Sequence, residues 1–481
     1  MRLLHVVRWK IVFRLYGSRA LPRLVVISNR VALPGGAQAR AGGLAVAIRE
    51  ALQANGGLWF GWSGETADVV PPEPRTITRG NITYAVTDLT QEEHELYYAG
   101  YSNGALWPLL HFRVGLIEYR RNAAQAYFAV NRRFATMLAP LIGRDDLIWV
   151  QDYHLIPLGS ALRELGIANR IGFFLHTPIP PPEVMIALPR HERLIEAMCA
   201  YDVVGFQTDE NRRAFLRCVT QIGGGTAESD GHFTAFGRSG YAAAFPIGID
   251  TEEFADLARR SAGSPEAQRL ESSLGQRKLI LGIDRLDYSK GIPERFEAIE
   301  GLLTDSPEFR AQFTYLQITP HSRSEIGEYR ALRRRIDALA GRINGRFAEF
   351  DWSPIRYINR SFTRATLAGF NRHARIGFVT PIRDGMNLVA KEFVAAQDPD
   401  DPGVLILSRF AGAAKELDAA LLVNPMDVDE LVIALRRGLL MSLAERRERW
   451  QAMMAMVRRN TITTWRTNFL AALSNRQYAI A

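Results

Sequence analysis

The sequence predicts an α/β protein made of two doubly wound domains, each built on a parallel sheet, that face each other across a cleft. Its 481 residues exceed what a single hydrophobic core usually serves, so two domains are the natural expectation. Each half opens with an apolar run, residues 24–27 and residues 279–283, that leads into polar residues and a glycine-containing loop. Uninterrupted apolar runs of this length are typical of parallel strands buried on both faces.

Polar side chains follow three buried strands of the first half. Residues 24–27 lead to Arg30 and then to a glycine pair that opens a helix over residues 44–54, and two later apolar runs end at Asp152 and His176. Ligand-binding residues of open parallel sheets collect at the carboxyl ends of strands. A glycine pair before a helix also suits an anion, although tight turns need glycine for steric reasons alone. A lone strand-end histidine is more often structural than catalytic, so the role of His176 depends on its neighbours.

Aromatic residues are concentrated between the first of these strands and the second. The stretch includes residues 59–62, Tyr98 and Trp107. Most aromatic residues of this kind pack in a core or an interface. Clusters beside glycine turns also form platforms for sugar rings, and both interpretations stay open at this point.

The loop that begins the second half carries two cations. Arg285 and Lys290 lie between the apolar run 279–283 and a helix that begins near Pro293, where proline suits the first turn. Two cations beside a helix N-terminus match the charge of a pyrophosphate. The alternative is that both are solvated, as exposed loop cations usually are.

A second helix N-terminus favours the ligand-binding interpretation. The apolar run 376–379 leads into a turn with Asp384 and Gly385, and residues 388–397 have helix-forming composition. First-turn N–H groups have no intrahelical acceptor and the helix dipole adds positive potential, so a phosphate fits there. Glu392, one turn into the helix, is placed to accept hydrogen bonds from two hydroxyls of a ribose. The alternative is a capped helix with solvated carboxylates.

Composition argues against a nucleic-acid-binding or membrane protein. The net charge of +8 fits either a nucleic-acid surface or sites for small anions. The basic runs 330–346 and 446–459 carry acidic residues and lack interleaved aromatic residues, so solvated helix faces are expected there. No apolar run approaches the roughly 18 residues that a membrane helix needs.

Cysteine use and the acidic residues argue against a metal site. Cys199 and Cys218 form no Cys-x-x-Cys pattern and are expected to be buried, reduced thiols of a cytoplasmic protein. The acidic stretch 398–402 follows a helix in a turn-rich loop and is expected at the surface. We therefore predict no metal and no other cofactor.

Seven segments, in the same order along the chain, resemble the trehalose-6-phosphate synthases. They are Ser28-Asn-Arg30, Ala41-Gly-Gly-Leu44, Gly57-Leu-Trp-Phe-Gly-Trp62, Asp152-Tyr-His-Leu, Gly172-Phe-Phe-Leu-His176, Arg285-Leu-Asp-Tyr-Ser-Lys-Gly291 and Arg383-Asp-Gly-Met-Asn-Leu-Val-Ala-Lys-Glu392. The resemblance implies a retaining glycosyltransferase of the GT-B architecture. It also implies transfer of glucose from a nucleotide sugar, UDP-glucose, to the sugar phosphate glucose 6-phosphate without a metal.

The resemblance further implies a role for each matching residue. The catalytic group would be Arg285, Lys290, Asp384 and His176. The donor would be held by Gly43, Arg285, Lys290, Asp384, Gly385, Met386, Asn387, Leu388, Val389 and Glu392. The acceptor would be held by Arg30, Tyr98, Trp107, Asp152 and Arg323.

Departures from the family pattern are small. Gln151 stands where relatives often have histidine, and Thr177 and Ile179 vary the loop after His176. Related enzymes on the same scaffold use glycerol 3-phosphate, as in glucosylglycerol-phosphate synthase, or join cyclitols as pseudo-glycosyltransferases. Those acceptors remain the alternative, and assembly into a homo-oligomer stays open.

Domain boundaries follow from composition and from the resemblance. Residues 1–22 form a basic extension, for which an edge strand, a tail and a misplaced start codon are all compatible interpretations. Residues 23–246 form the acceptor-binding domain and residues 247–459 the donor-binding domain. The resemblance implies that a C-terminal helix within residues 460–481 returns to the first domain.

Overall fold

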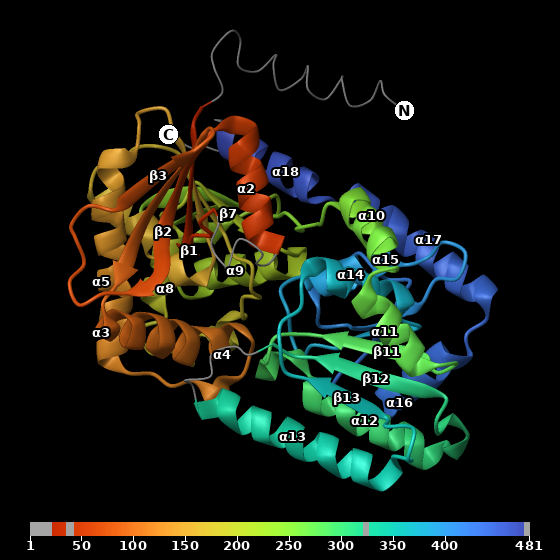
Figure 1. The fold of residues 1–481 in the computed structure, drawn as a ribbon. Helices are drawn as coiled ribbons and strands as arrows, with labels where there is room; N and C mark the ends of the chain where they lie inside the picture. The colour runs from red at the N-terminus through yellow and green to blue at the C-terminus, as the bar shows by residue number, and fades with distance from the viewer. Residues whose placement is uncertain (1–21, 35–42, 321–326, 476–481) are drawn as a thin grey trace.

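The computed structural model describes residues 22–34, 43–320 and 327–475 (Figure 1). The basic extension before residue 22 and the candidate acceptor residue Arg323 therefore lie outside the described residues. No helix in the described part of the chain is long and apolar enough to cross a membrane.

The described chain forms two β-sheets, and most of their strand pairs are parallel. The first sheet has ten strands in the order β3-β4-β2-β1-β5-β6-β7-β10-β9-β8, and the second has six in the order β13-β12-β11-β14-β15-β16. The strands of the first sheet are β1 (Leu24–Arg30), β2 (Gly57–Thr66), β3 (Arg75–Arg79), β4 (Ile82–Leu89), β5 (Leu147–Gln151), β6 (Ile171–Phe174), β7 (Val203–Phe206), β8 (Thr226–Ala227), β9 (His232–Ala235) and β10 (Arg238–Ala244). Those of the second are β11 (Lys278–Ile283), β12 (Phe313–Ile318), β13 (Ile355–Ile358), β14 (Ile376–Val379), β15 (Val404–Ser408) and β16 (Leu421–Val423).

Helices cover both faces of each sheet, which confirms the predicted fold class (Figure 1). Around the first sheet lie α2 (Gly43–Asn55), α3 (Gln91–Glu93), α4 (Trp107–Leu110), α5 (Arg121–Leu138), α6 (Leu158–Glu164), α7 (Pro182–Met185), α8 (Glu192–Met198), α9 (Asp209–Gln221) and α18 (Ile462–Ser474). Around the second lie α10 (Thr251–Ser261), α11 (Pro265–Leu274), α12 (Ile292–Asp305), α13 (Gly327–Phe347), α14 (Arg364–His373), α15 (Leu388–Ala396), α16 (Val428–Leu440) and α17 (Leu443–Arg459). We call these two parts the first lobe (22–34, 43–244 and 462–475) and the second lobe (251–320 and 327–459).

Strand β1 shows why an uninterrupted apolar run is needed. Alternate residues of a strand point to opposite faces, so Leu24 and Val26 join the core with α2 and α18 while Val25 and Ile27 join the core with α5. All four side chains are at most 2% exposed. Full burial of one such side chain is worth about 1.5–3 kcal/mol, so both faces stabilise the sheet.

The chain passes between the lobes twice, and the two passages touch. The first is residues 245–250, and the second joins α17 to α18 at Asn460 and Thr461. The backbone N–H of Ile462 donates to the carbonyl oxygen of Ile249 at 3.2 Å. The helix α18 then packs on the first sheet, where Phe469 stacks on Trp149 with ring centroids 4.8 Å apart.

Gly248 is needed because the two passages leave no room for a side chain. A Cβ at this position would lie 1.8 Å from the carbonyl oxygen of Asn460, which is backbone and cannot rotate away. We expect Gly248→Ala to lower the free energy of unfolding by about 1–3 kcal/mol, the usual cost of overpacking. Urea denaturation measures this change. Gly263→Ala is the matched control, because a Cβ there meets nothing within 4 Å, and an equal loss in both variants would contradict the explanation.

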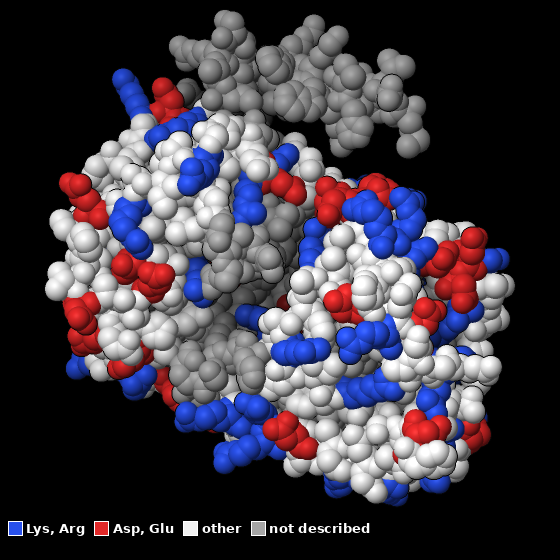
Figure 2. All heavy atoms as spheres, in the orientation of Figure 1, with Lys and Arg blue, Asp and Glu red and all other residues white. Residues whose placement is uncertain are grey.

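Charged residues expected at the surface are paired there. The acidic stretch 398–402 is bound by arginines, with Asp398 2.8 Å from Arg372 and Asp401 3.0 Å from Arg375. In the described residues no group of three or more His, Cys, Asp or Glu side chains is arranged to hold a metal ion. On the face shown in Figure 2, positive and negative side chains are interspersed, and a hollow runs between the lobes.

Candidate active site

The cationic loop after β11 enters α12 through a residue that must be glycine. Gly291 has φ +66°, in the left-handed region, and a Cβ there would lie 2.2 Å from the carbonyl oxygen of Thr380. The tight turn brings Lys290 beside the turn that precedes α15, although the two segments are far apart in the sequence. This proximity is the first condition for a shared anion site.

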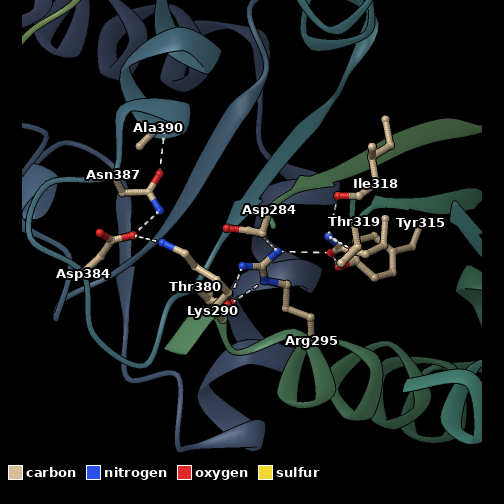
Figure 3. Close-up of polar contacts among 11 residues, drawn as sticks. Asp284, Lys290, Arg295, Tyr315, Ile318, Thr319, Thr380, Asp384, Asn387 and Ala390 are labelled. Carbon is tan, nitrogen blue, oxygen red and sulfur yellow. Dashed lines mark hydrogen bonds and ion pairs between the residues drawn. The ribbon is translucent and has the colours of Figure 1, made fainter. Parts of the chain in front are cut away.

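Lys290 and Asp384 form an ion pair at the centre of the site (Figure 3). Lys290 Nζ lies 2.5 Å from Asp384 Oδ2, and their side chains are only 12% and 16% exposed. The same carboxylate oxygen accepts a hydrogen bond from Asn387 Nδ2 at 3.1 Å. Burial by itself would raise the pKa of Asp384, but Lys290 outweighs it and the pKa is lowered below its usual value. The carboxylate is therefore charged at neutral pH.

Helix α15 begins at a strained residue next to this pair. Asn387 has φ +78°, which is uncommon for a residue other than glycine, and its Oδ1 caps the helix by accepting from the N–H of Ala390 at 3.3 Å. The N–H groups of Leu388 and Val389 belong to the same first turn, which has no intrahelical acceptor. Strain of this kind costs about 1–3 kcal/mol and concentrates at functional sites. The predicted anion-binding geometry is present here.

A buried arginine, Arg295, supports the cationic loop, and the sequence analysis did not predict this role. Arg295 is 0% exposed and donates to Asp284 Oδ2 at 2.6 Å, to Thr380 Oγ1 at 2.9 Å and to the carbonyl oxygen of Lys290 at 2.7 Å (Figure 3). These bonds hold the ends of β11 and β14 together with the loop. The available signal was an arginine on the apolar face of α12, at helical spacing from Ile292 and Ile299, because such a charge is buried only when it is paired.

Glu392 lies one turn into α15 in a very different environment from Asp384. Its side chain is half-buried and has no hydrogen bond or ion pair among the described residues. Burial raises the pKa of Glu392 to about 7, while Arg364 lowers it and Glu253 raises it further. Arg364 is shared, since it also forms an ion pair with Glu253 at 2.8 Å. Glu392 therefore changes charge near neutral pH.

On the first lobe, Arg30 ends β1 among aromatic residues. Its guanidinium lies 5.5 Å from the ring centre of Trp62. Gly64, with φ +95°, makes room for it, because a Cβ there would lie 2.3 Å from the guanidinium. The ring of Tyr98 packs against Trp62, with centroids 5.3 Å apart, and against His154, with centroids 5.8 Å apart. Most of the aromatic stretch 59–62 is buried in the core, and Trp62 also contacts the Arg30 cation.

Trp107 connects the two lobes. Its indole Nε1 donates to Asp287 Oδ1 at 3.3 Å, across 180 residues of chain. The guanidinium of Arg285 lies 5.6 Å from the ring centre of Trp107. A second contact between an arginine and an aromatic ring joins the lobes, because the guanidinium of Arg383 lies 3.8 Å from the ring centre of Phe112. The predicted acceptor residue Trp107 thus touches the predicted donor loop directly.

Asp152 and His176 end neighbouring strands, β5 and β6. Asp152 has φ +73° and ψ 167°, a conformation that is strained for an aspartate, and its Oδ1 accepts from the backbone N–H of His176 at 3.2 Å. The carbonyl oxygen of His176 faces the second lobe at Gly385, where a Cβ would lie only 1.9 Å away. This close approach explains the glycine in the turn before α15.

Hydrogen bonds, ion pairs and close backbone approaches therefore bring most of the predicted residues of the two lobes together, with two exceptions. Arg323 is outside the described residues, and Gly43 is described only as the first residue of α2. Gln207, which follows β7 and contacts His176, is a further strand-end residue that sequence reasoning missed. Its signal was its position after a fourth buried strand run of the same sheet.

Two facing lobes of this kind, with a cationic loop and a helix N-terminus on one wall and polar strand ends on the other, define a glycosyltransferase of the GT-B class. The chain belongs to glycosyltransferase family 20, whose family model matches residues 28–475. The predicted family and architecture are confirmed.

Relatives of known name are similar over almost the whole chain. The trehalose-6-phosphate synthase of Sinorhizobium fredii is 50% identical over 457 residues, which is 94% of this chain and 98% of that protein. A crystal structure of the UDP-forming alpha,alpha-trehalose-phosphate synthase from Burkholderia xenovorans in complex with glucose-6-phosphate has a TM-score of 0.91 and 47% identity, covering 94% of this chain and 100% of that one. A trehalose-6-phosphate protein from E. coli bound with UDP-2-fluoro glucose has a TM-score of 0.90 and 46% identity, covering 95% of this chain and 99% of that one.

Proposed function

We propose that this protein is an alpha,alpha-trehalose-phosphate synthase, which transfers glucose from UDP-glucose to glucose 6-phosphate with retention of configuration. The products are trehalose 6-phosphate and UDP. The relatives support both substrates, since one similar structure holds glucose-6-phosphate and another holds UDP-2-fluoro glucose. The observation that carries the proposal is the Lys290–Asp384 pair beside the N-terminus of α15.

On the donor side, positive charge meets the diphosphate from two elements. Arg285 and Lys290 come from the loop after β11, and the N–H groups of Leu388 and Val389 come from α15. Negative charge grows on the diphosphate as the glycosidic bond breaks, so these groups stabilise the transition state more than the bound substrate. Asp384, held ionised by Lys290, accepts hydrogen bonds from hydroxyls of the transferred glucose.

The acceptor wall lies opposite, on the first lobe. Arg30 attracts the phosphate of glucose 6-phosphate, and the rings of Tyr98 and Trp107 contact the sugar. Asp152 accepts a hydrogen bond from a sugar hydroxyl. The hydroxyl attacks from the face that the diphosphate leaves, and the leaving phosphate takes its proton. Retention then needs no nucleophile from the protein.

One assay separates this proposal from the alternative acceptors. Nucleoside diphosphate release is measured across UDP-glucose and other nucleotide glucoses, with glucose 6-phosphate or glycerol 3-phosphate as acceptor, and products are identified by nuclear magnetic resonance. We expect turnover with UDP-glucose and glucose 6-phosphate and a doubly α-linked product. Faster turnover with glycerol 3-phosphate would replace the proposal with a glucosylglycerol-phosphate synthase.

The pKa of Glu392 predicts how donor binding depends on pH. A ribose hydroxyl donates to the carboxylate, so UDP-glucose binds the ionised form, and Glu392 with a pKa of about 7 loses that form as the pH falls. We expect the dissociation constant of UDP-glucose to rise about tenfold between pH 8 and pH 6, by linkage. Calorimetric titration measures it. Glu392→Gln should bind more weakly with no such pH dependence, whereas Glu266→Gln on exposed α11 should behave as wild type.

A cytoplasmic location remains part of the proposal. It is supported by Cys199 and Cys218, which are both buried free thiols. Burial raises the pKa of each thiol to about 12, so neither is a reactive thiolate at neutral pH. The domain boundaries at residues 246 and 459 and assembly into a homo-oligomer stay predictions.

A further inference from the structure

The imidazole ring of His176 is held by two glutamine side chains. Its Nε2 lies 2.9 Å from Gln151 Oε1, and its Nδ1 lies 3.3 Å from Gln207 Nε2. The ring also makes tilted contacts with Phe174, with centroids 4.6 Å apart, and with Trp465, with centroids 5.9 Å apart. Both ring nitrogens are thus engaged before any substrate binds.

The backbone determines which way these hydrogen bonds run. The N–H of Ile247, in the first passage between the lobes, donates to Gln207 Oε1 at 3.0 Å. A backbone N–H can only donate, so the amide oxygen of Gln207 faces Ile247 and its NH2 group faces the ring. An NH2 group can only donate, so Nδ1 of His176 must accept. The single proton of the ring is therefore on Nε2.

We propose that Gln207 is a positioning residue for the glucosyl transfer, which fixes His176 as the neutral tautomer that carries its proton on Nε2. The inference rests on the proposed function for its role in the reaction, and on the hydrogen bonds alone for the tautomer. His176 then always offers a donor at Nε2 to a sugar hydroxyl.

Gln151 is the less firmly anchored of the two glutamines. Its Nε2 is buried with no hydrogen-bond partner in the described structure, so only its oxygen holds it to the ring. Gln207, by contrast, is anchored to the backbone through its oxygen. Both glutamines are buried, with exposed fractions of 0% for Gln151 and 2% for Gln207. The Nε2 side of His176 is thus held by a single hydrogen bond, and the Nδ1 side by an amide that is itself anchored to the backbone.

The surroundings of the ring keep it neutral. Burial lowers the pKa of His176 to about 3. Among the described residues, the groups in contact with His176 include the two amides and the two aromatic rings described above, together with Asp152, whose carboxylate accepts from the backbone N–H of His176. A protonated ring would direct Nδ1–H at the NH2 group of Gln207. Protonation therefore costs both desolvation and a donor–donor contact.

The same passage residue also contacts the donor helix. The carbonyl oxygen of Ile247 accepts from Lys391 Nζ at 2.8 Å, and Lys391 is fully buried in α15 with Glu416 2.9 Å away. Gln207 therefore ties the ring of His176 to the backbone segment that holds α15. The position of the ring and the position of the donor site are set by one shared residue.

The Gln207→Glu substitution tests the proposed tautomer of His176 and keeps the hydrogen bond from the N–H of Ile247. A carboxylate still offers one oxygen to the N–H of Ile247 but presents an acceptor to Nδ1 where the amide presented a donor. We expect the neutral ring to carry its proton on Nδ1, so that Nε2 becomes an acceptor, and the carboxylate should also raise the pKa of His176 into the range of about 5–8 usual for a histidine. At pH 7, kcat should fall at least tenfold, and the pH profile of kcat should gain an ionisation in that range.

Nuclear magnetic resonance of protein labelled with ¹⁵N-histidine reads the tautomer directly, and the His176→Asn variant identifies the signals. The wild type should show a protonated Nε2 and an unprotonated Nδ1 that do not change between pH 5.5 and pH 8.5. Gln221→Glu, at the exposed end of α9, carries the same charge change and should leave the signals and kcat unaltered.

Two results would overturn the proposal. One is a wild-type His176 with its proton on Nδ1, which needs no folded variant and no substrate to observe. The other is a Gln207→Glu protein in which both the His176 signals and the pH profile of kcat match the wild type. The spectrum is independent of activity, so absence of synthase activity would refute the proposed function while the tautomer is judged separately.

Discussion

Lys290→Ala should lower kcat by about 10²- to 10³-fold, which corresponds to the roughly 3–4 kcal/mol that one such electrostatic contact contributes in a transition state. Two effects add. The diphosphate loses a cation as its charge grows, and Asp384 loses the charge that keeps its pKa low, so burial raises that pKa. Because both effects are greatest during bond cleavage, kcat should suffer more than the dissociation constant of UDP-glucose. Single-turnover kinetics at saturating substrates measures the chemical step.

Lys278→Ala is the matched control for this experiment. Lys278 begins β11, the strand whose other end leads to Lys290, and its Nζ binds only the carbonyl oxygen of Leu439 among the described residues. Removing this charge should leave kcat within about twofold. A Lys290→Ala enzyme that turns over at the wild-type rate with saturating substrates would remove Lys290 from the transition state.

The sequence predicted the elements of the site better than their contacts. The expected strand 376–379 and the helix from residue 388 appear as β14 and α15, because strand hydrophobicity and helix composition are local properties. The bond from Trp107 to Asp287 spans 180 residues and the one from Lys290 to Asp384 spans 94. The first contact depends on how the two lobes pack and the second on how distant loops meet within one lobe, and no local pattern encodes either.

The two carboxylates of the donor site illustrate the same limit. Asp384 and Glu392 lie eight positions apart, so the sequence assigns both to one helix N-terminus and one kind of chemistry. In the structure, Lys290 lowers the pKa of Asp384, whereas Glu392 lacks such a partner and its pKa rises to about 7. The cation that makes the difference comes from a distant loop. The motif therefore identifies the residues, and only the fold assigns their charge.

The sequence analysis also missed two buried residues that support the site. Arg295 and Gln207 touch no predicted ligand position, yet each holds a residue that does. Motif reasoning looks for groups that face a substrate, and these two face the backbone of Lys290 and the ring of His176. Their signal in the sequence is weak, because a polar residue in an apolar stretch is informative only once its partner is known.

Arg30→Ala should weaken binding of glucose 6-phosphate by about 30- to 1000-fold, the 2–4 kcal/mol expected when a desolvated charge pair loses one partner. The guanidinium is held against Trp62 and in the space left by Gly64, so it is already positioned for a phosphate. Binding of UDP-glucose should change little, because the donor-binding residues other than Gly43 are on the other lobe. The sequence predicts the same result for Arg323→Ala, from the opposite side of the phosphate, and calorimetric titration with each substrate measures both variants.

Two further substitutions separate the effect of the guanidinium geometry of Arg30 from the effect of its positive charge. Arg30→Lys keeps the positive charge but loses the planar fork and the stacking on Trp62, so we expect it to recover only part of the lost affinity. Arg79→Ala removes an exposed arginine from β3 in the same sheet and should leave both affinities unchanged, as surface charges contribute at most about 1 kcal/mol. Equal weakening of both substrates by Arg30→Ala, or of neither, would show that Arg30 does not bind the acceptor phosphate.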